Sequence, residues 1–265
     1  MLLGKNFRGG GRLIAYDDSW YHQERKEGET PRFFELDFFN CSVPLLSEKE
    51  KQKYLSSNRF LKLIGLKRIK RVREKPINKY NEKLLRLKKG YVSGYFQVGA
   101  YYEQIRPFLQ KELYPKEKPN RENEEMIQKI LSTNSVSLHV RRGDYLALKN
   151  LHGICDLNYY QKAVDFIEKN VENPVFFLFS DDPNWVKENL KLNHPYFIVD
   201  INKNEKSPWD MWLMSLCQHN IIANSSFSWW GAFLNQNEKN ITIAPKVWFA
   251  DGGAEEIYLK SWILL

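Results

Sequence analysis

The segment Ser135-Val-Ser-Leu-His-Val-Arg-Arg-Gly-Asp144 alternates apolar and polar residues and then ends in charge. In a β-strand, residues two apart share a face, so His139 and Arg141 point together, opposite the apolar residues between them. The glycine at the end allows a tight turn, and Asp144 follows it where a carboxylate could hold one guanidinium. The segment therefore predicts a strand that ends at a polar site.

Further strands and helices alternate after this segment. The apolar run Val175–Phe179 is typical of a strand that is covered on both faces, and a helix is expected at 157–170 before it. Pro183 after Asp182 and Pro208 after Ser207 each indicate a capped helix start, the second with Asp210 in its first turn. Such alternation predicts an α/β class with a parallel, Rossmann-like sheet. The other expected strands are Tyr196–Asp200, Asn220–Ala223 and Ile241–Ala244.

The first 132 residues have a less regular pattern, so we expect the chain to divide into 1–132 and 133–265. Ser47 and Glu50 form a capping box that predicts a helix start. The stretch 114–123 is rich in proline and charge, as a linker would be. Expected strands in this part are Leu13–Tyr16, Phe33–Phe39 and Tyr91–Gln97, and a helix is expected near Tyr101–Leu109.

Charge is concentrated in one segment of the 265 residues. Residues 62–89 hold twelve Lys/Arg and two acids, a balance of +10, whereas the chain as a whole carries +8. We expect a basic helical segment within 48–89, and three interpretations stay open for 60–89: a solvated helix, contact with anionic membrane, or nucleic-acid binding. No zinc-finger or RNA-binding signature supports nucleic acid.

Cysteine usage and hydropathy indicate the compartment. Three cysteines far apart build no disulfide framework, which favours a reducing environment. No apolar stretch approaches the roughly 18 residues of a membrane span. We therefore expect a cytoplasmic protein, with a peripheral position at the inner face of the membrane as the alternative.

Polar residues follow four of the five strands expected after residue 133. Because carboxyl ends of parallel strands meet at one edge, these residues predict a binding site there. Arg141 and Arg142 suit bidentate contact with phosphate, and the turn at 224–228 before a helix offers backbone N–H groups and hydroxyls to an anion. Two such groups facing one crevice suggest a pyrophosphate. Structural alternatives are an ion pair of Arg142 or Arg141 with Asp144 and simple helix capping by the serines.

The sequence lacks the residue spacing that several other kinds of active site require. The chain has no G-x-x-x-x-G-K-[ST] loop for a nucleoside triphosphate and no G-x-S-x-G hydrolase elbow. Its five histidines show no zinc spacing, and no Asp-x-Asp is present to hold a metal with a nucleotide sugar. Asp181 and Asp182 could bind Mg²⁺, but capping before Pro183 is simpler. No metal or other cofactor is expected.

Several further stretches are distinctive: His139-Val-Arg-Arg-Gly-Asp-Tyr145, Phe179-Ser-Asp-Asp182, Asp210–Leu234, Gly94-Tyr-Phe-Gln97, His152-Gly-Ile-Cys155 and Ile243–Phe249. Through these motifs the chain resembles the bacterial α-1,2-fucosyltransferases of glycosyltransferase family 11. The similarity runs from about residue 13 to the end, and the stretch Asp210–Leu234 is the most specific part. The resemblance implies a GT-B-like arrangement of two Rossmann-like halves and a metal-independent, inverting transfer of L-fucose from GDP-β-L-fucose to the 2-hydroxyl of a terminal galactose.

The resemblance also implies residue roles. Arg141 contacts the β-phosphate as the catalytic residue, and Asp210 accepts hydrogen bonds from guanine, unless it only belongs to a capping box. His139 is a candidate for the base or for contact with ribose or guanine. The candidate donor-binding residues are His139, Arg142, Asp144, Asp182, Asp210, Asn224, Ser225, Ser226, Phe227 and Ser228.

One departure from the family pattern concerns the beginning of the chain. Residues 1–7 read like the middle of the family's first helix, so we expect its first strand and Gly-rich loop to be missing. An alternative function is therefore a catalytically impaired remnant that binds a nucleotide sugar. For an active enzyme, the expected partners are GDP-fucose and a galactose-terminated glycan, which a lipid could carry.

Overall fold

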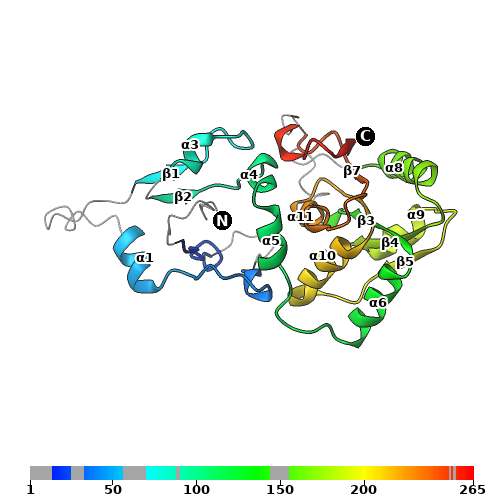
Figure 1. Ribbon diagram of the computed structural model, residues 1–265, viewed down its shortest axis with the longest axis horizontal. Coiled ribbons are helices and arrows are strands. Elements are labelled where there is room, and N and C mark those ends of the chain that lie inside the picture. Colours follow the sequence, from blue (N-terminus) through cyan, green and yellow to red (C-terminus); the bar gives the residue numbers. More distant parts are fainter. Residues whose placement is uncertain are drawn as a thin grey trace, which may run out of the picture.

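The computed structural model describes residues 14–24, 33–55, 70–87, 90–143, 155–250, 252 and 255–265. Figure 1 shows a smaller group of elements at one end of an elongated molecule and the large sheet at the other. In the smaller group, β1 and β2 pair in parallel. Its elements are η1 (Leu36–Phe38), α1 (Glu48–Leu55), β1 (Arg71–Arg73), α3 (Glu82–Leu85), β2 (Tyr91–Ser93), α4 (Ala100–Glu103) and α5 (Arg106–Glu112).

The large sheet has six strands among the described residues, all parallel, in the order β5-β4-β3-β6-β7-β8. Neighbouring strands β3 and β6 are far apart in sequence, and the chain runs outward from them in opposite directions. Their bounds are β3 (Asn134–Val140), β4 (Pro174–Ser180), β5 (Tyr196–Val199), β6 (His219–Ile221), β7 (Thr242–Ala244) and β8 (Ile263–Leu264).

Helices cover both faces of this sheet. On one face, Val136 and Leu138 of β3 pack with α8 (Leu157–Asn170) and α9 (Pro183–Asn189). On the other face, Phe177 and Phe179 of β4 pack with α6 (Arg121–Leu131) and α10 (Ser207–Leu216). The alternation of each strand therefore buries two separate cores. The bounds of the other helical elements are η2 (Asn204–Lys206), α11 (Ser226–Leu234) and η3 (Glu255–Ile257).

Helices α10 and α11 cross closely on the same face. A Cβ on Gly231 would stand 2.9 Å from Met214 Cβ and 3.3 Å from the Met211 carbonyl oxygen, so glycine permits the close approach. Helix α10 leads into β6 and α11 leaves it, so both run antiparallel to that strand. Their first turns therefore lie at the edge of the sheet where β6 ends.

The regular second part matches the sequence analysis closely. The predicted helix at 157–170 is confirmed, and all five predicted strands are present with small changes at their ends. Asp182 caps α9 as predicted, since its Oδ1 accepts from the Trp185 N–H at 3.1 Å. Strand β8 is an addition that the analysis did not predict.

The first part holds the wrong predictions. The stretch 33–39 forms the 3₁₀ turn η1 rather than a strand, because consecutive residues Phe38 and Phe39 both pack into one core. The strand expected at 91–97 ends at Ser93, before Phe96 adopts a φ of 52°. Of the strand expected at Leu13–Tyr16, the structure describes residues 14–16, and among these an isolated bridge joins Tyr16 to Leu45.

The other predictions for this part have mixed outcomes. The capping box is confirmed, with Ser47 N–H donating to Glu50 Oε2 at 2.9 Å. Within the expected basic helical segment, residues 56–69 lie outside the described residues. Residues 70–87 hold a strand and a short helix rather than one continuous helix.

The smaller group and the sheet share one hydrophobic core. Tyr102 of α4 packs edge-to-face against Trp229 and Phe233 of α11, with ring centroids 5.8 and 6.1 Å away. Arg106 of α5 donates from Nε to the Phe233 carbonyl at 2.9 Å and from Nη2 to the Asn235 carbonyl at 2.8 Å. These contacts tie α4 and α5 to the C-terminal end of α11.

Candidate functional site

The point where the sheet reverses its order lies between β3 and β6. From β3 the chain proceeds to β4 and β5 on one side, and from β6 to β7 and β8 on the other. In open parallel sheets, ligands bind outside the carboxyl ends of the strands at such a switch point. The end of β3 carries His139 and Arg141, and the turn after β6 carries residues 224–228, so the structure brings these two predicted groups to the same edge of the sheet on neighbouring strands.

The face of β3 decides which of its polar residues take part. His139 lies on the face covered by α11, with its ring centroid 5.8 Å from that of Phe227. Arg141 follows two residues later and projects to the same face, where its charge acts on His139. Arg141 therefore lies on the same side of the sheet as the first turn of α11.

Asp181 holds the turn that follows β3. Its Oδ2 lies 3.2 Å from Arg141 Nε, and its carboxylate accepts from the backbone N–H of Arg142 at 2.9 Å and of Gly143 at 3.0 Å. A Cβ on Gly143 would lie 2.7 Å from Asp181 Oδ2, so any larger residue at this position would require the Asp181 side chain to move. Asp144, predicted to hold a guanidinium, lies outside the described residues.

Asp181 contacts the predicted site residue Arg141, but the sequence analysis left it out of the site. The available signal was the motif Phe179-Ser-Asp-Asp182, in which the sequence analysis preferred a capping role to Mg²⁺ binding and took only Asp182 as a donor-binding candidate. The register pairs Val140 with Ser180, so the next residue of each strand, Arg141 and Asp181, also meet. Without that register the sequence does not decide which aspartate reaches which arginine.

Arg142 projects to the opposite face. Its Nε lies 3.7 Å from Asp182 Oδ2, and its guanidinium carbon lies 3.9 Å from the ring centroid of Trp185 in α9. This arrangement joins the turn after β3 to the start of α9 through an ion pair and a cation–π contact. The two arginines therefore do not form one fork, and the partners of Arg142 are structural.

His139 is buried and neutral. Burial, and secondarily the positive charge of Arg141, lower its pKa to about 3. Its Nδ1 has no hydrogen-bond partner among the described residues. Such a side chain can exchange a hydrogen bond with a ligand, but its low pKa makes it a weak proton acceptor.

The turn at 224–228 divides into structural and available groups. Asn224 donates from Nδ2 to the Trp248 carbonyl at 3.0 Å, and Ser228 donates from Oγ to the Ser225 carbonyl at 3.3 Å, so both side chains hold the loop together. Ser225 is the N-cap of α11 but makes no side-chain capping bond. Ser226 is exposed at the first position of the helix. The anion-binding potential thus rests on Ser225, Ser226 and the helix N-terminus.

Asp210 lies in the first turn of α10 without capping it. The prediction that Ser207 caps this helix is wrong, because Ser207 is already the first residue of the helix. Its hydroxyl donates instead to Glu35 Oε1 at 3.2 Å. Asp210 Oδ1 instead accepts from Asn202 Nδ2 at 2.8 Å. Burial raises the pKa of Asp210 to about 7, and the negative charge of Asp200 adds to the effect. Because α10 and α11 begin at the same edge, Asp210 shares that edge with Ser226.

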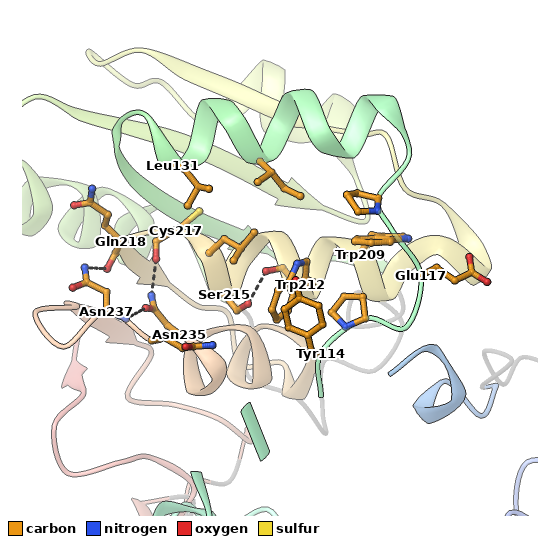
Figure 2. Close-up of a pocket in the computed structure, with 15 residues that line it drawn as sticks. Tyr114, Glu117, Leu131, Trp209, Trp212, Ser215, Cys217, Gln218, Asn235 and Asn237 are labelled. Carbon is orange, nitrogen blue, oxygen red and sulfur yellow. Dashed lines mark hydrogen bonds between the residues drawn. The ribbon is translucent and has the colours of Figure 1, made fainter. Parts of the chain in front are cut away.

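A cavity of about 690 Å³ runs along α10 away from these residues. Figure 2 shows Tyr114, Trp209 and Trp212 along it, with Leu131 of α6 above. Of the described residues predicted for the site, none lines this cavity, and no described lysine or arginine does. The amides at its end are used within the protein, as when Asn235 Nδ2 donates to the Cys217 carbonyl at 2.7 Å. The sequence did not predict this cavity, and its walls do not suit a diphosphate.

Metal ligands and membrane spans were also sought in the described part of the chain. There, no three His, Cys, Asp or Glu side chains gather as a metal site would require. Among the same residues, no helix combines the length and the apolar character needed to cross a bilayer.

Comparison with known proteins identifies relatives for nearly the whole chain. The model of glycosyl transferase family 11 matches residues 34–265. The O-antigen biosynthesis glycosyltransferase WbnK of Escherichia coli is 36% identical over 279 aligned positions, which cover 96% of this chain and 91% of that protein.

Two further relatives match shorter regions. An alpha-1,2-colitosyltransferase of Escherichia coli is 39% identical over 180 positions, covering 64% of this chain and 60% of that protein. Human galactoside alpha-(1,2)-fucosyltransferase 1 is 29% identical over 136 positions, covering 48% of this chain and 37% of the human protein. The similarity thus extends from bacterial to mammalian glycosyltransferases.

Proposed function

The chain belongs to glycosyltransferase family 11, and from this premise we propose that it is a galactoside α-1,2-fucosyltransferase. It would transfer L-fucose from GDP-β-L-fucose to the 2-hydroxyl of a terminal galactose, with inversion and without a metal. The name of the human relative supports fucose transfer to a galactoside through an α-1,2 linkage, and the name of the colitosyltransferase supports the same linkage.

The observation that carries the proposal is the pairing of Arg141 with Asp181 at the switch point, on the side of the sheet where α11 begins. In the reaction, the galactose 2-hydroxyl oxygen bonds to the anomeric carbon of fucose while the bond from that carbon to GDP breaks. GDP leaves with its electron pair, so negative charge grows on the β-phosphate, and the hydroxyl proton passes to a base. Arg141 and the start of α11 suit stabilisation of that charge.

The other site residues take supporting roles in this proposal. Asp210 accepts hydrogen bonds from guanine, which presents two adjacent N–H donors, and its lack of a capping role favours this function. His139 contacts the nucleotide rather than acting as the base, since its pKa is too low for efficient proton abstraction. Arg142 and Asp182 shape the site from the opposite face of the sheet.

We also propose that the chain forms two Rossmann-like halves of the GT-B type, 1–132 and 133–265. Parallel pairing of β1 with β2 supports an α/β architecture in the first half. The residues between α5 and α6 lack helix and strand, and α6 packs on the large sheet, so these features favour a boundary before α6 rather than after it. In such an arrangement the first half would supply most acceptor contacts.

The test uses the full chain with GDP-fucose and lactose, with mass spectrometry to detect fucosylated lactose. Arg141→Ala should lower kcat by about a hundredfold or more, because one charge-stabilising donor contributes roughly 3–4 kcal/mol to the transition state. Arg121→Ala, which removes an exposed ion pair in α6, should leave kcat unchanged. An Arg141→Ala enzyme that keeps wild-type turnover would refute the assigned role.

A second candidate function is colitosyl transfer, which the name of the relative with 39% identity favours. Both reactions would use the same nucleotide site and differ only in the sugar. Parallel assays with GDP-fucose and GDP-colitose distinguish them through the ratio of kcat/KM. Binding of GDP without product from either donor would instead favour the impaired nucleotide-sugar binder.

A further inference from the structure

A chain of amide side chains leads from α6 to Asp210. Asn120 Oδ1, at the start of α6, accepts from the backbone N–H of Asn123 at 3.0 Å and from its Nδ2 at 2.8 Å. Asn123 and Asn202 then exchange two side-chain hydrogen bonds, each of 2.9 Å. Asn202 Nδ2 also donates to Asp210 Oδ1 at 2.8 Å. The chain joins α6, the segment after β5 and the first turn of α10.

The direction of every hydrogen bond in this chain is fixed by its first member. A backbone N–H only donates, so the atom of Asn120 that faces it must be the oxygen. That oxygen requires the Asn123 amide to present its nitrogen, which in turn requires the oxygen of Asn202 at the same contact. Asn202 is left with its NH₂ group directed at Asn123 Oδ1 and Asp210 Oδ1. If the Asn202 amide were rotated by 180°, its oxygen would face Asn123 Oδ1 and Asp210 Oδ1, which are both acceptors.

Burial makes this orientation costly to change. Asn123 is 1% exposed and Asn202 is 6% exposed, so an amide that lost its partner could not replace it with water. Fully satisfied buried networks of this kind are rigid, because each member supports the orientation of the next. Asp210 is thus held by a donor that has no alternative position.

The held carboxylate keeps acceptor capacity for a ligand. The ionised carboxylate, which is the main form of Asp210 above its pKa of about 7, offers about four lone-pair sites on two oxygens, and Asn202 occupies one of them on Oδ1. Among the described residues, Asp210 Oδ2 has no assigned hydrogen-bond partner. Both oxygens can therefore accept from two adjacent N–H donors of one planar ligand.

From this geometry we infer that Asn202, locked by Asn123, is a positioning residue that sets the selectivity of the nucleotide site for guanine. The inference rests on the proposed function, in which Asp210 contacts the base of GDP. Guanine presents its ring N–H and its exocyclic amine side by side, whereas hypoxanthine lacks the amine and adenine presents an acceptor at the ring nitrogen. A carboxylate held in one orientation distinguishes these edges, and a freely rotating one does so less well.

The test measures calorimetric affinities for GDP, IDP and ADP in the full chain. Wild type should prefer GDP over IDP by roughly ten- to a hundredfold, the range expected for one hydrogen bond to a charged group. Asn202→Ala should lower this ratio to about threefold or less. Asn202→Asp, which removes the donor and places a second carboxylate beside Asp210, should abolish the preference. Asn134→Ala removes an exposed asparagine bond to the Glu172 carbonyl and should retain the wild-type ratio.

The outcomes separate this inference from the proposed function. A merely structural Asn202 would lower thermal stability and all affinities together but leave the ratio of GDP to IDP unchanged, which would overturn the inference. A wild-type chain that bound no GDP would overturn the proposed function instead. In the transfer assay, Asn202→Ala should raise KM for GDP-fucose more than it lowers kcat, since base contacts are made in both the ground state and the transition state.

Discussion

At the scale of single residues, Asp181 connects the end of β3 with the proposed donor site. Its carboxylate accepts from the turn at Arg142 and Gly143 and also faces Arg141 Nε. One side chain therefore fixes both the backbone after the strand and the direction of the guanidinium. A carboxylate this close also partly neutralises Arg141, so under the proposed function the gain from positioning must outweigh the loss of positive charge near the phosphate.

Asp181→Asn tests this balance. The amide retains one acceptor for the turn but gives up the second and the charge, so Arg141 gains freedom and turnover should fall roughly tenfold or more. Steady-state kinetics with GDP-fucose measure the change, and Glu125→Gln, in an exposed ion pair of α6, is the matched control. An increase in kcat would mean that neutralisation outweighs positioning.

Asp210 gives a prediction for pH. Its pKa rises from the ordinary 3.8 to about 7 on folding, so the folded state binds this proton more tightly than the unfolded state. The corresponding stability is present below about pH 4 and is lost as the pH rises to 7. The substitution Asp210→Asn removes the ionisable group. As the pH rises from 4.5 to 8, the free energy of unfolding of this variant should therefore increase by roughly 2–4 kcal/mol relative to that of wild type.

Denaturant unfolding of both proteins at the two pH values measures that difference. The comparison cancels the titration of every group that the substitution leaves alone, with Asp200 as the exception because its charge acts on Asp210. A difference between the two proteins that stays constant with pH would contradict the raised pKa.

Residue-level predictions from the sequence succeeded where a local rule was sufficient. The period of two placed His139 and Arg141 on one face, and Pro183 identified Asp182 as a cap. Asp181 and Asn202 required knowledge of contacts between distant segments. The Asn123–Asn202 pair, for instance, spans 79 residues, and no local pattern encodes such a pairing.

At the scale of elements, the start of α9 is stabilised by an N-cap and an ion pair that share Asp182. Asp182 accepts from the Trp185 N–H as an N-cap and pairs with Arg142, which lies over the Trp185 ring. The cap satisfies a helix N–H that has no intrahelical partner, and the ion pair joins the helix to the turn after β3. Substitutions at Asp182 can separate the two contributions.

Asp182→Ala removes both and should lower the free energy of unfolding by about 1–2 kcal/mol. Asp182→Asn keeps a good N-cap but loses the charge, so it should cost less than about 1 kcal/mol, because a partly exposed pair at 3.7 Å is weak. Denaturant midpoints measure both variants. Equal losses for the two would show that the ion pair, and not the cap, stabilises this start.

Element predictions followed the strength of the pattern. Buried strands and the 14-residue helix α8 have long, regular periodicity, and the sequence predicted them well. The stretch 33–39 has similar apolar content, but tertiary contacts decide its form. Its Phe39 pairs with Pro115 in one isolated bridge while Phe38 packs against Trp209, which a turn permits and a strand does not.

At the scale of the whole molecule, the shared core decides how the two parts behave together. Tyr102 of α4 and the α11 residues Trp229 and Phe233 belong to the same cluster, and Arg106 binds two carbonyls at the end of α11. The N-terminal turn of that same helix faces the proposed phosphate site. Packing against α4 and α5 at one end of α11 therefore supports the position of its other end.

Arg106→Ala is expected to weaken this connection. It leaves the Phe233 and Asn235 carbonyls without their arginine donor and removes a guanidinium that lies 5.3 Å from the Phe233 ring centroid. The free energy of unfolding should fall by about 2–3 kcal/mol. In wild type, calorimetric and van't Hoff enthalpies should agree, because a shared core makes both parts unfold together. In Arg106→Ala the van't Hoff value should become the smaller one, and a variant that stays two-state would mean that aromatic packing alone couples the parts.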